Sequence, residues 1–124
     1  MEVAVDLARN VLVLRVHPGE PSGAAQPAAA TIDIGEGGRL LAVEVAAATG
    51  DTLAMLAAGE GSPFVSFDPT AATMTVELER QPGGLVRSAA ARVGLVKDGG
   101  GTLLAVEVPR RGAGYEITYP SGNR

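Results

Sequence analysis

The chain of 124 residues contains no cysteine, one histidine, no tryptophan, and only two residues each of phenylalanine and tyrosine. Without cysteine there can be no disulfide framework, no thiolate metal site and no cysteine nucleophile. The single histidine, His17, lies in a turn-like His-Pro-Gly-Glu run, where we expect a solvated loop side chain. A histidine-rich metal site is therefore excluded, and a histidine general base would have to be this residue.

Positive charge is also sparse. The 10 lysine and arginine residues are scattered, 14 acidic residues outnumber them, and the formal net charge is −4. Nucleic-acid binding requires a basic stripe and usually aromatic stacking platforms, so we expect no nucleic-acid partner. No apolar run approaches the roughly 20 residues that span a bilayer, and the first residues do not resemble a signal peptide. We therefore expect no membrane contact and a cytoplasmic location.

Small apolar residues and turn formers are what the chain has in abundance. Hydrophobic residues make up 46% of the sequence and aromatic residues only 3%, so Ala, Val and Leu must supply the core. The 17 glycines and 8 prolines are too many for a helical bundle and indicate frequent turns. This composition favours a mainly β domain whose core is built from small side chains.

The sequence contains an internal repeat. Residues 38–45 recur as residues 101–108 with seven of eight positions identical, at an offset of 63. Farther upstream, residues 5–14 align with residues 67–76 at an offset of 62. A one-residue gap in the intervening loop reconciles the two offsets. We therefore interpret the chain as a tandem duplication.

Each copy reads as four strands, because its β-branched or alternating runs are bounded by Asx and Gly turns. The expected strands are residues 2–5, 11–16, 30–34 and 40–45 in the first copy, and 64–67, 73–78, 92–96 and 103–108 in the second. Between the copies a short helix is expected at residues 51–58, with Asp51 as its N-cap. An extra strand is expected at residues 115–119.

We predict a single domain made of two repeats, with repeat one at residues 1–48, a helical linker at 49–62, and repeat two with the extra strand at 63–119. The expected fold is two pseudo-symmetric four-stranded antiparallel meanders packed as a sandwich or flattened barrel. The period of two places Leu41, Val43 and Val45 on one face, which suits burial against the other meander. Half of the chain, about 62 residues, would bury too little surface to be robust alone.

Residues 5–14 form an Asp/Asn-bounded hairpin pattern, and residues 32–45 form an acidic strand, a Gly turn and a second strand. In these motifs the repeated unit resembles the small uncharacterised bacterial domains of the DUF2283 family. Residues 67–69 of the second copy fit that hairpin better, whereas Ala72 and Lys97 depart from the pattern. The resemblance covers roughly three quarters of the chain. It implies a four-stranded antiparallel sheet for each copy and brings no known activity.

Two pairs of carboxylates recur at equivalent positions, Asp6 with Asp68 and Glu44 with Glu107. If the copies pack about a pseudo-two-fold axis, equivalent carboxylates could meet, act as acid and base, or hold a hard cation such as Ca²⁺ or Mg²⁺. The alternative is structural, with the aspartates capping turns and the glutamates facing solvent. The four are weak candidates for a metal site. No catalytic residue, cofactor-binding residue or cofactor is predicted.

The sequence favours a non-catalytic accessory or interaction domain, since no catalytic constellation emerges from it. The alternative is a small-ligand or divalent-cation binding module that uses the paired carboxylates at the cleft between the repeats. An enzyme relying on carboxylates alone is the least favoured class. The chain is expected to be a monomer, or a homodimer formed through an exposed apolar edge strand such as residues 115–119.

Overall fold

The computed structural model describes residues 2–58, 61, 64–78 and 85–118, without the side chains of residues 85 and 86. Its elements are, in chain order, β1 (Glu2–Asp6), β2 (Val11–Arg15), β3 (Gln26–Gly35), the 3-10 turn η1 (Glu36–Gly38), β4 (Arg39–Ala46), α1 (Gly50–Ala57), β5 (Val65–Asp68), β6 (Thr73–Glu77), β7 (Leu85–Lys97), β8 (Leu103–Pro109), β9 (Arg111–Gly112) and β10 (Tyr115–Glu116).

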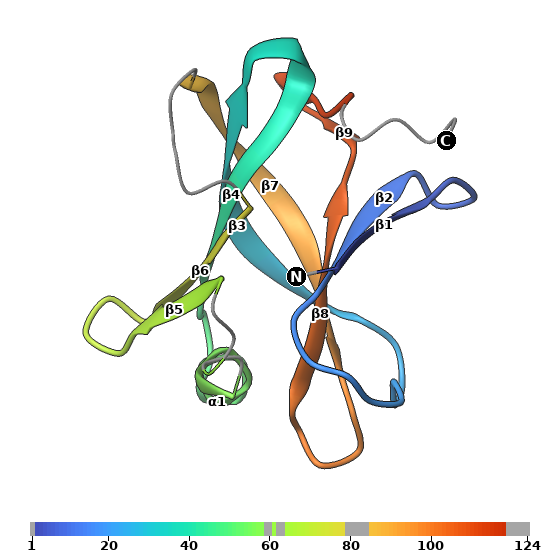
Figure 1. The fold of residues 1–124 in the computed structure, drawn as a ribbon. Helices are drawn as coiled ribbons and strands as arrows, with labels where there is room; N and C mark the ends of the chain where they lie inside the picture. Colours follow the sequence, from blue (N-terminus) through green and yellow to red (C-terminus); the bar gives the residue numbers. More distant parts are fainter. Residues whose placement is uncertain (1, 59–60, 62–63, 79–84, 119–124) are drawn as a thin grey trace.

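Strands β1–β8 form one curled antiparallel sheet in the order β1-β2-β8-β7-β3-β4-β6-β5 (Figure 1). This order is symmetric, because exchanging each of β1–β4 with the strand four places later reverses it. The long strands β3 and β7 are therefore central, and β1 and β5 are the edges. The predicted fold class, a mainly β antiparallel barrel-like structure with one short helix, is confirmed.

The connectivity differs from that of two consecutive meanders. The β1–β2 hairpin joins β8, with Val13 opposite Glu107, and the β5–β6 hairpin joins β4, with Thr75 opposite Glu44. Each four-stranded half of the sheet, β1-β2-β8-β7 or β3-β4-β6-β5, thus contains one hairpin from each repeat. The physical reason is the long connection at residues 16–25, which does not impose the tight turn that would pair β2 with β3.

The core lies inside the curl of the sheet and is built from alternate strand positions. Val43 and Val45 are fully buried in this core, as their spacing predicted. The prediction fails at Leu41, because a register shift in the β3–β4 ladder leaves Leu41 without a partner on β3 and brings Leu40 into the core instead. Leu12 of β2 and Met74 of β6 are fully buried too. Aliphatic side chains of moderate size fill most of this space, so a curled sheet whose two halves face each other needs few aromatic residues.

The central strands are longer than predicted, because the chain pairs through alanine runs that have little intrinsic strand preference. β3 begins at Gln26 instead of residue 30, and β7 begins at Leu85 instead of residue 92. In the middle of the sheet Ala30 lies opposite Ala91. Pairing between the two runs therefore overrides local propensity at the centre of symmetry.

The segment after β8 does not form the predicted edge strand at residues 115–119. Its short hairpin, β9–β10, is separate from the main sheet, and Tyr115 and Ile117 are buried in the core. Their alternate spacing turns both apolar side chains inward, so the segment covers the core and offers no apolar edge. Tyr119 lies outside the described residues.

Helix α1 begins one residue earlier than predicted and has a different N-cap. Thr49, and not Asp51, is the N-cap, since its Oγ1 accepts a hydrogen bond from the backbone N–H of Thr52 at 3.2 Å. Asp51 lies in the first turn, where a carboxylate complements the helix dipole. Among the residues that the structure describes, no helix has the length and apolar character needed to cross a membrane.

Candidate functional site

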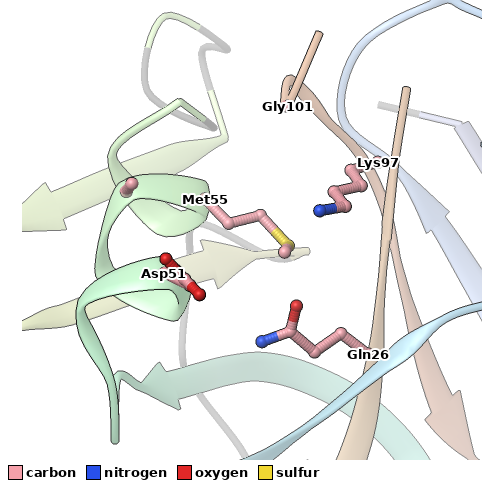
Figure 2. A pocket seen from close by; sticks show the side chains of 6 residues that line it. Gln26, Asp51, Met55, Lys97 and Gly101 are labelled. Atoms are coloured by element: carbon pink, nitrogen blue, oxygen red, sulfur yellow. The ribbon is translucent and has the colours of Figure 1, made fainter. Parts of the chain in front are cut away.

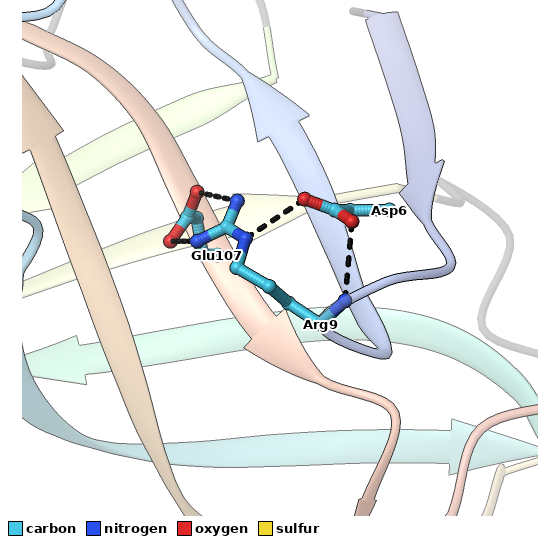
Figure 3. A network of polar contacts seen from close by, with 3 residues as sticks. All are labelled: Asp6, Arg9 and Glu107. Atoms are coloured by element: carbon cyan, nitrogen blue, oxygen red, sulfur yellow. Dashed lines mark hydrogen bonds and ion pairs between the residues drawn. The ribbon is translucent and has the colours of Figure 1, made fainter.

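Two of the four candidate carboxylates meet, but they come from different pairs. Asp6 and Glu107 are bridged by Arg9, which lies in the β1–β2 turn (Figure 3). Arg9 Nη1 and Nη2 donate to the two carboxylate oxygens of Glu107 at 2.9 and 2.7 Å, and Arg9 Nε donates to Asp6 Oδ2 at 2.8 Å. A bidentate arginine–carboxylate pair of this kind fixes orientation as well as charge. The network locks the β1–β2 hairpin onto β8.

The electrostatics of this network favour the charged forms. The hydrogen bond from the Arg9 side chain lowers the pKa of Asp6 below its ordinary value of 3.8. Glu107 and Asp6 together raise the pKa of Arg9, with the hydrogen bond to Glu107 contributing most. Both acidic side chains are therefore engaged by protein groups and serve the attachment of the hairpin.

The equivalent positions in the other half of the sheet have no such bridge. Asp68 Oδ1 accepts hydrogen bonds from the backbone N–H groups of Thr70 and Ala71, at 2.9 and 3.2 Å. Ala71 stands where the first repeat has Arg9, and Glu44 is exposed on β4. Asp68 therefore caps its turn, as the structural alternative predicted. Asp6 caps its own turn in the same way, because its Oδ1 accepts a hydrogen bond from the backbone N–H of Arg9.

The structure does not bring equivalent carboxylates together. Glu107 on β8 and Glu44 on β4 are separated by β7 and β3, three strand spacings or about 14 Å across the sheet. Asp6 and Asp68 belong to opposite sheet edges, and their hairpin turns project on opposite sides of the molecule (Figure 1). Within the described part of the chain, no group of three or more His, Asp or Glu side chains is placed to hold a metal ion. The predicted paired-carboxylate cleft is therefore wrong, because the symmetry axis passes between the centres of β3 and β7.

His17 lies in the connection that follows β2. Its backbone N–H donates to Leu104 O at 3.2 Å, and the residue is half-buried. This contact ties the start of the long connection to β8. The histidine is thus held at the sheet, closer to the protein than the predicted solvated position.

A pocket of about 340 Å³ does lie between the repeats, at a place the sequence did not indicate. It is bounded by α1, by the start of β3, and by the end of β7 with the turn that follows it (Figure 2). The residues that line it are Gln26, Asp51, Ala54, Met55, Lys97 and Gly101. We call the end of the molecule at which this pocket lies the open end.

The opposite end is closed by the segment after β8. Thr118 N donates to Gly38 O at 2.9 Å and Thr118 Oγ1 donates to Gly37 O at 2.6 Å, so this segment seals the β3–β4 turn. A Cβ on Gly38 would collide with Thr118 Oγ1. At Gly101, its equivalent in the second repeat, no atom of the described residues other than its chain neighbours lies within 4 Å of the same position. The two ends differ because a helix follows the first repeat and a hairpin the second.

The open end carries both signs of charge. Figure 2 shows Asp51 on the helix and Lys97 on the facing strand, with Met55 between them and Gln26 below. Gln26 Nε2 donates to Thr52 Oγ1 at 3.0 Å, which anchors the amide to the first turn of the helix. Among the described residues, neither the Asp51 carboxylate nor the Lys97 ammonium has a polar partner.

Sequence reasoning missed this pocket because its residues come from three separate segments. The one available signal was Lys97, which departs from the acidic strand of the repeat pattern and is the only lysine in the chain. Comparison with known proteins adds no further information, since no family model, no curated protein and no solved structure matches the chain.

Proposed function

We propose that this protein is a non-catalytic binding domain whose site is the pocket at the open end. The observation that carries the proposal is the difference between the two ends. The segment after β8 fills one end, whereas at the other end no described residue approaches the corresponding position at Gly101, which lines the pocket. Concave sites with an apolar wall and a few converging polar groups are the usual places for small ligands.

The roles of the duplicated carboxylates support a binding domain over an enzyme. Glu107 and Asp6 are both engaged by Arg9, and Asp68 is occupied as a turn cap. Glu44 is exposed and is not among the residues that line the pocket. A general acid or base needs a titratable group aimed at a substrate. The charged residues that line the pocket are Asp51 and Lys97, so the small-ligand alternative is kept at these residues, and the divalent-cation version is dropped.

Filling the pocket tests the proposal. Ala54→Trp places a large ring in the pocket from α1, and Ala57→Trp, on the same helix but outside the pocket, is the matched control. We expect amide resonances around Lys97 and Gly101 to shift when a panel of small amines, carboxylates and free amino acids is added. Ala54→Trp should abolish these shifts and Ala57→Trp should not. Shifts that are absent for the whole panel, or that Ala54→Trp leaves unchanged, would contradict the proposal.

A second candidate, a protein-interaction domain, is favoured by the edges of the sheet. In the part of the chain that the structure describes, β1 and β5 are each paired along one side only, and such edges can accept another strand. Antiparallel pairing of β1 with a second copy, centred on Ala4, would set Glu2 opposite Asp6, which disfavours that homodimer. Sedimentation velocity over a range of concentrations tests the homodimer prediction. A monomer at every concentration would exclude the homodimer, and a strand added to β1 or β5 would then have to come from a different protein.

The kinship with DUF2283, the tandem duplication, and the bacterial and cytoplasmic setting belong to the same proposal. The symmetric strand order supports the duplication, because it is the order that two copies exchanging hairpins would produce. A structure of a single-copy DUF2283 domain tests the kinship: a homodimer with exchanged hairpins is expected, and an unrelated topology would contradict it.

A further inference from the structure

We infer that the pocket at the open end takes a small zwitterion, a molecule that carries one ammonium and one carboxylate, such as a free amino acid. This inference rests on the proposed function and names the class of ligand. It follows from which groups face the pocket, from their signs of charge, and from the size of the space.

The anion-binding side is Lys97. It is the last residue of β7, and Figure 2 shows its ammonium directed into the pocket. Lys97 has no ion-pair partner among the described residues, so its three donors are available. The neighbouring carboxylate Asp98 is engaged elsewhere, since its Oδ1 accepts from the backbone N–H groups of Gly100 and Thr102, each at 2.9 Å.

The cation-binding side is Asp51 with Gln26. Asp51 is in the first turn of α1, and Thr49 provides the helix cap, so the Asp51 carboxylate is not used for capping. The amide nitrogen of Gln26 donates to Thr52, which turns Gln26 Oε1 towards the pocket (Figure 2). A ligand ammonium would therefore meet one charged and one neutral acceptor.

The two charges together select against singly charged ligands. A simple anion drawn to Lys97 would also lie near Asp51, and a simple cation drawn to Asp51 would lie near Lys97, so each gains one attraction and meets one repulsion. A zwitterion gains from both. Met55, which is 4% exposed, provides an apolar wall for the carbon skeleton, and about 340 Å³ lies at the small end of ligand-site volumes.

The test uses four probes with the intact protein: L-alanine, β-alanine, propionate and ethylamine. The two alanine isomers differ in the spacing of ammonium and carboxylate. Propionate lacks their ammonium and ethylamine lacks their carboxylate, so both singly charged probes are matched to both isomers. Affinities are measured by following the amide resonances of the pocket residues. We expect at least one isomer to bind about tenfold or more tightly than either singly charged probe.

Charge-removing variants supply the second readout. Lys97→Gln should weaken binding of the zwitterion about tenfold and leave ethylamine binding equal or stronger. Asp51→Asn should also weaken binding of the zwitterion about tenfold, and it should leave propionate binding equal or stronger. Arg92→Gln, on the same strand as Lys97, and Glu36→Gln, an exposed carboxylate at the closed end, change net charge equally and should have little effect.

The outcomes separate the two proposals. If propionate or ethylamine shifts the pocket resonances and neither isomer binds more tightly, the zwitterion is wrong and the binding pocket stands. Equal effects of the pocket variants and the control variants would also overturn the zwitterion, since binding would then follow net charge. If no probe of the wider panel shifts the pocket resonances, both proposals fail.

Discussion

At the scale of single residues, the two hairpin turns have the same backbone conformation but carry different side chains. Asn10 and Ala72 are equivalent positions, and both have a φ of 56°, in the left-handed region. Asparagine tolerates this conformation, whereas the Cβ of alanine is strained in it. The second repeat therefore carries a local cost at Ala72 that the first repeat avoids.

Replacing Ala72 with glycine should relieve this strain. We expect Ala72→Gly to raise the free energy of unfolding by about 0.5–1 kcal/mol, since glycine adopts positive φ without steric cost. Ala90→Gly, at an exposed position within β7, is the control and should lower it by a similar amount. Chemical denaturation measures both. A loss of stability in Ala72→Gly would show that the turn is not strained.

The charge of Asp6 should make stability depend on pH in the acid range. Its pKa in the folded protein is lowered from the ordinary value of 3.8, chiefly by the hydrogen bond from Arg9. The unfolded chain therefore takes up the proton first as the pH falls. The contribution of Asp6 is present above 3.8 and is lost as the pH falls through the folded-state pKa.

Asp6→Asn tests this dependence, because asparagine keeps the oxygen that accepts from Arg9 N. We expect the variant to melt below the parent protein at neutral pH, with the difference disappearing in strong acid. Glu36→Gln, a change to an exposed carboxylate outside the network, is the control. A difference in melting temperature that is independent of pH would assign the effect of Asp6 to something other than its charge.

At the scale of elements, the two exchanged hairpins are attached by the same register but with different polar contacts. Val13 lies opposite Glu107 and Thr75 lies opposite Glu44, so the acidic residue is in the same place at both attachments. Only the β1–β2 hairpin has an arginine to engage it. The β5–β6 hairpin is therefore held by its backbone pairing and apolar face without this bridge.

Ala71→Arg should build the missing bridge, between Asp68 and Glu44. Because the turn geometry is shared, we expect slower amide hydrogen exchange in β5 and β6 and a small rise in melting temperature. Surface ion pairs contribute little individually, so the local exchange rates are the more sensitive measurement. The gain should vanish when Glu44→Gln is added. A gain that survives Glu44→Gln would mean that the new arginine acts elsewhere.

At the scale of the whole molecule, each repeat depends on the other for its sheet partners. In the complete chain β2 pairs with β8, β3 with β7, and β4 with β6. A fragment of residues 1–61 loses all three partners. We propose that covalent linkage of the two halves replaces an interface that separate chains would have to form by association.

Expression of residues 1–61 alone tests this dependence. We expect no stable folded monomer: the fragment should be unfolded or should dimerise by exchanging its β1–β2 hairpin with a second copy. Circular dichroism and sedimentation velocity distinguish these states. Mixing with residues 62–124 should restore β structure. A folded monomer of residues 1–61 would contradict the proposed role of the duplication.

Local patterns in the sequence were sufficient for much of the fold. The alternation at Val43 and Val45 indicated which face is buried, and the paired Gly turns indicated the hairpins, because both depend on neighbouring residues alone. The alternation did not reveal the register shift that brings Leu40 into the core in place of Leu41. The helix was found within one residue, although its cap was assigned to Asp51 instead of Thr49. The alanine runs of β3 and β7 were missed, since small residues carry little strand preference until they are paired.

Only the tertiary structure decided which strands are neighbours and therefore where the candidate site lies. Backbone hydrogen bonds are alike in every strand, so periodicity reveals a buried face but not the partner beside it. The exchange of hairpins moved Glu44 and Glu107 apart and brought Arg9 to Glu107, 98 positions away in the sequence. It also left Asp51 and Lys97 facing one pocket. Local patterns in the sequence by themselves determined most of the strands and the helix, and the long-range packing determined which side chains meet.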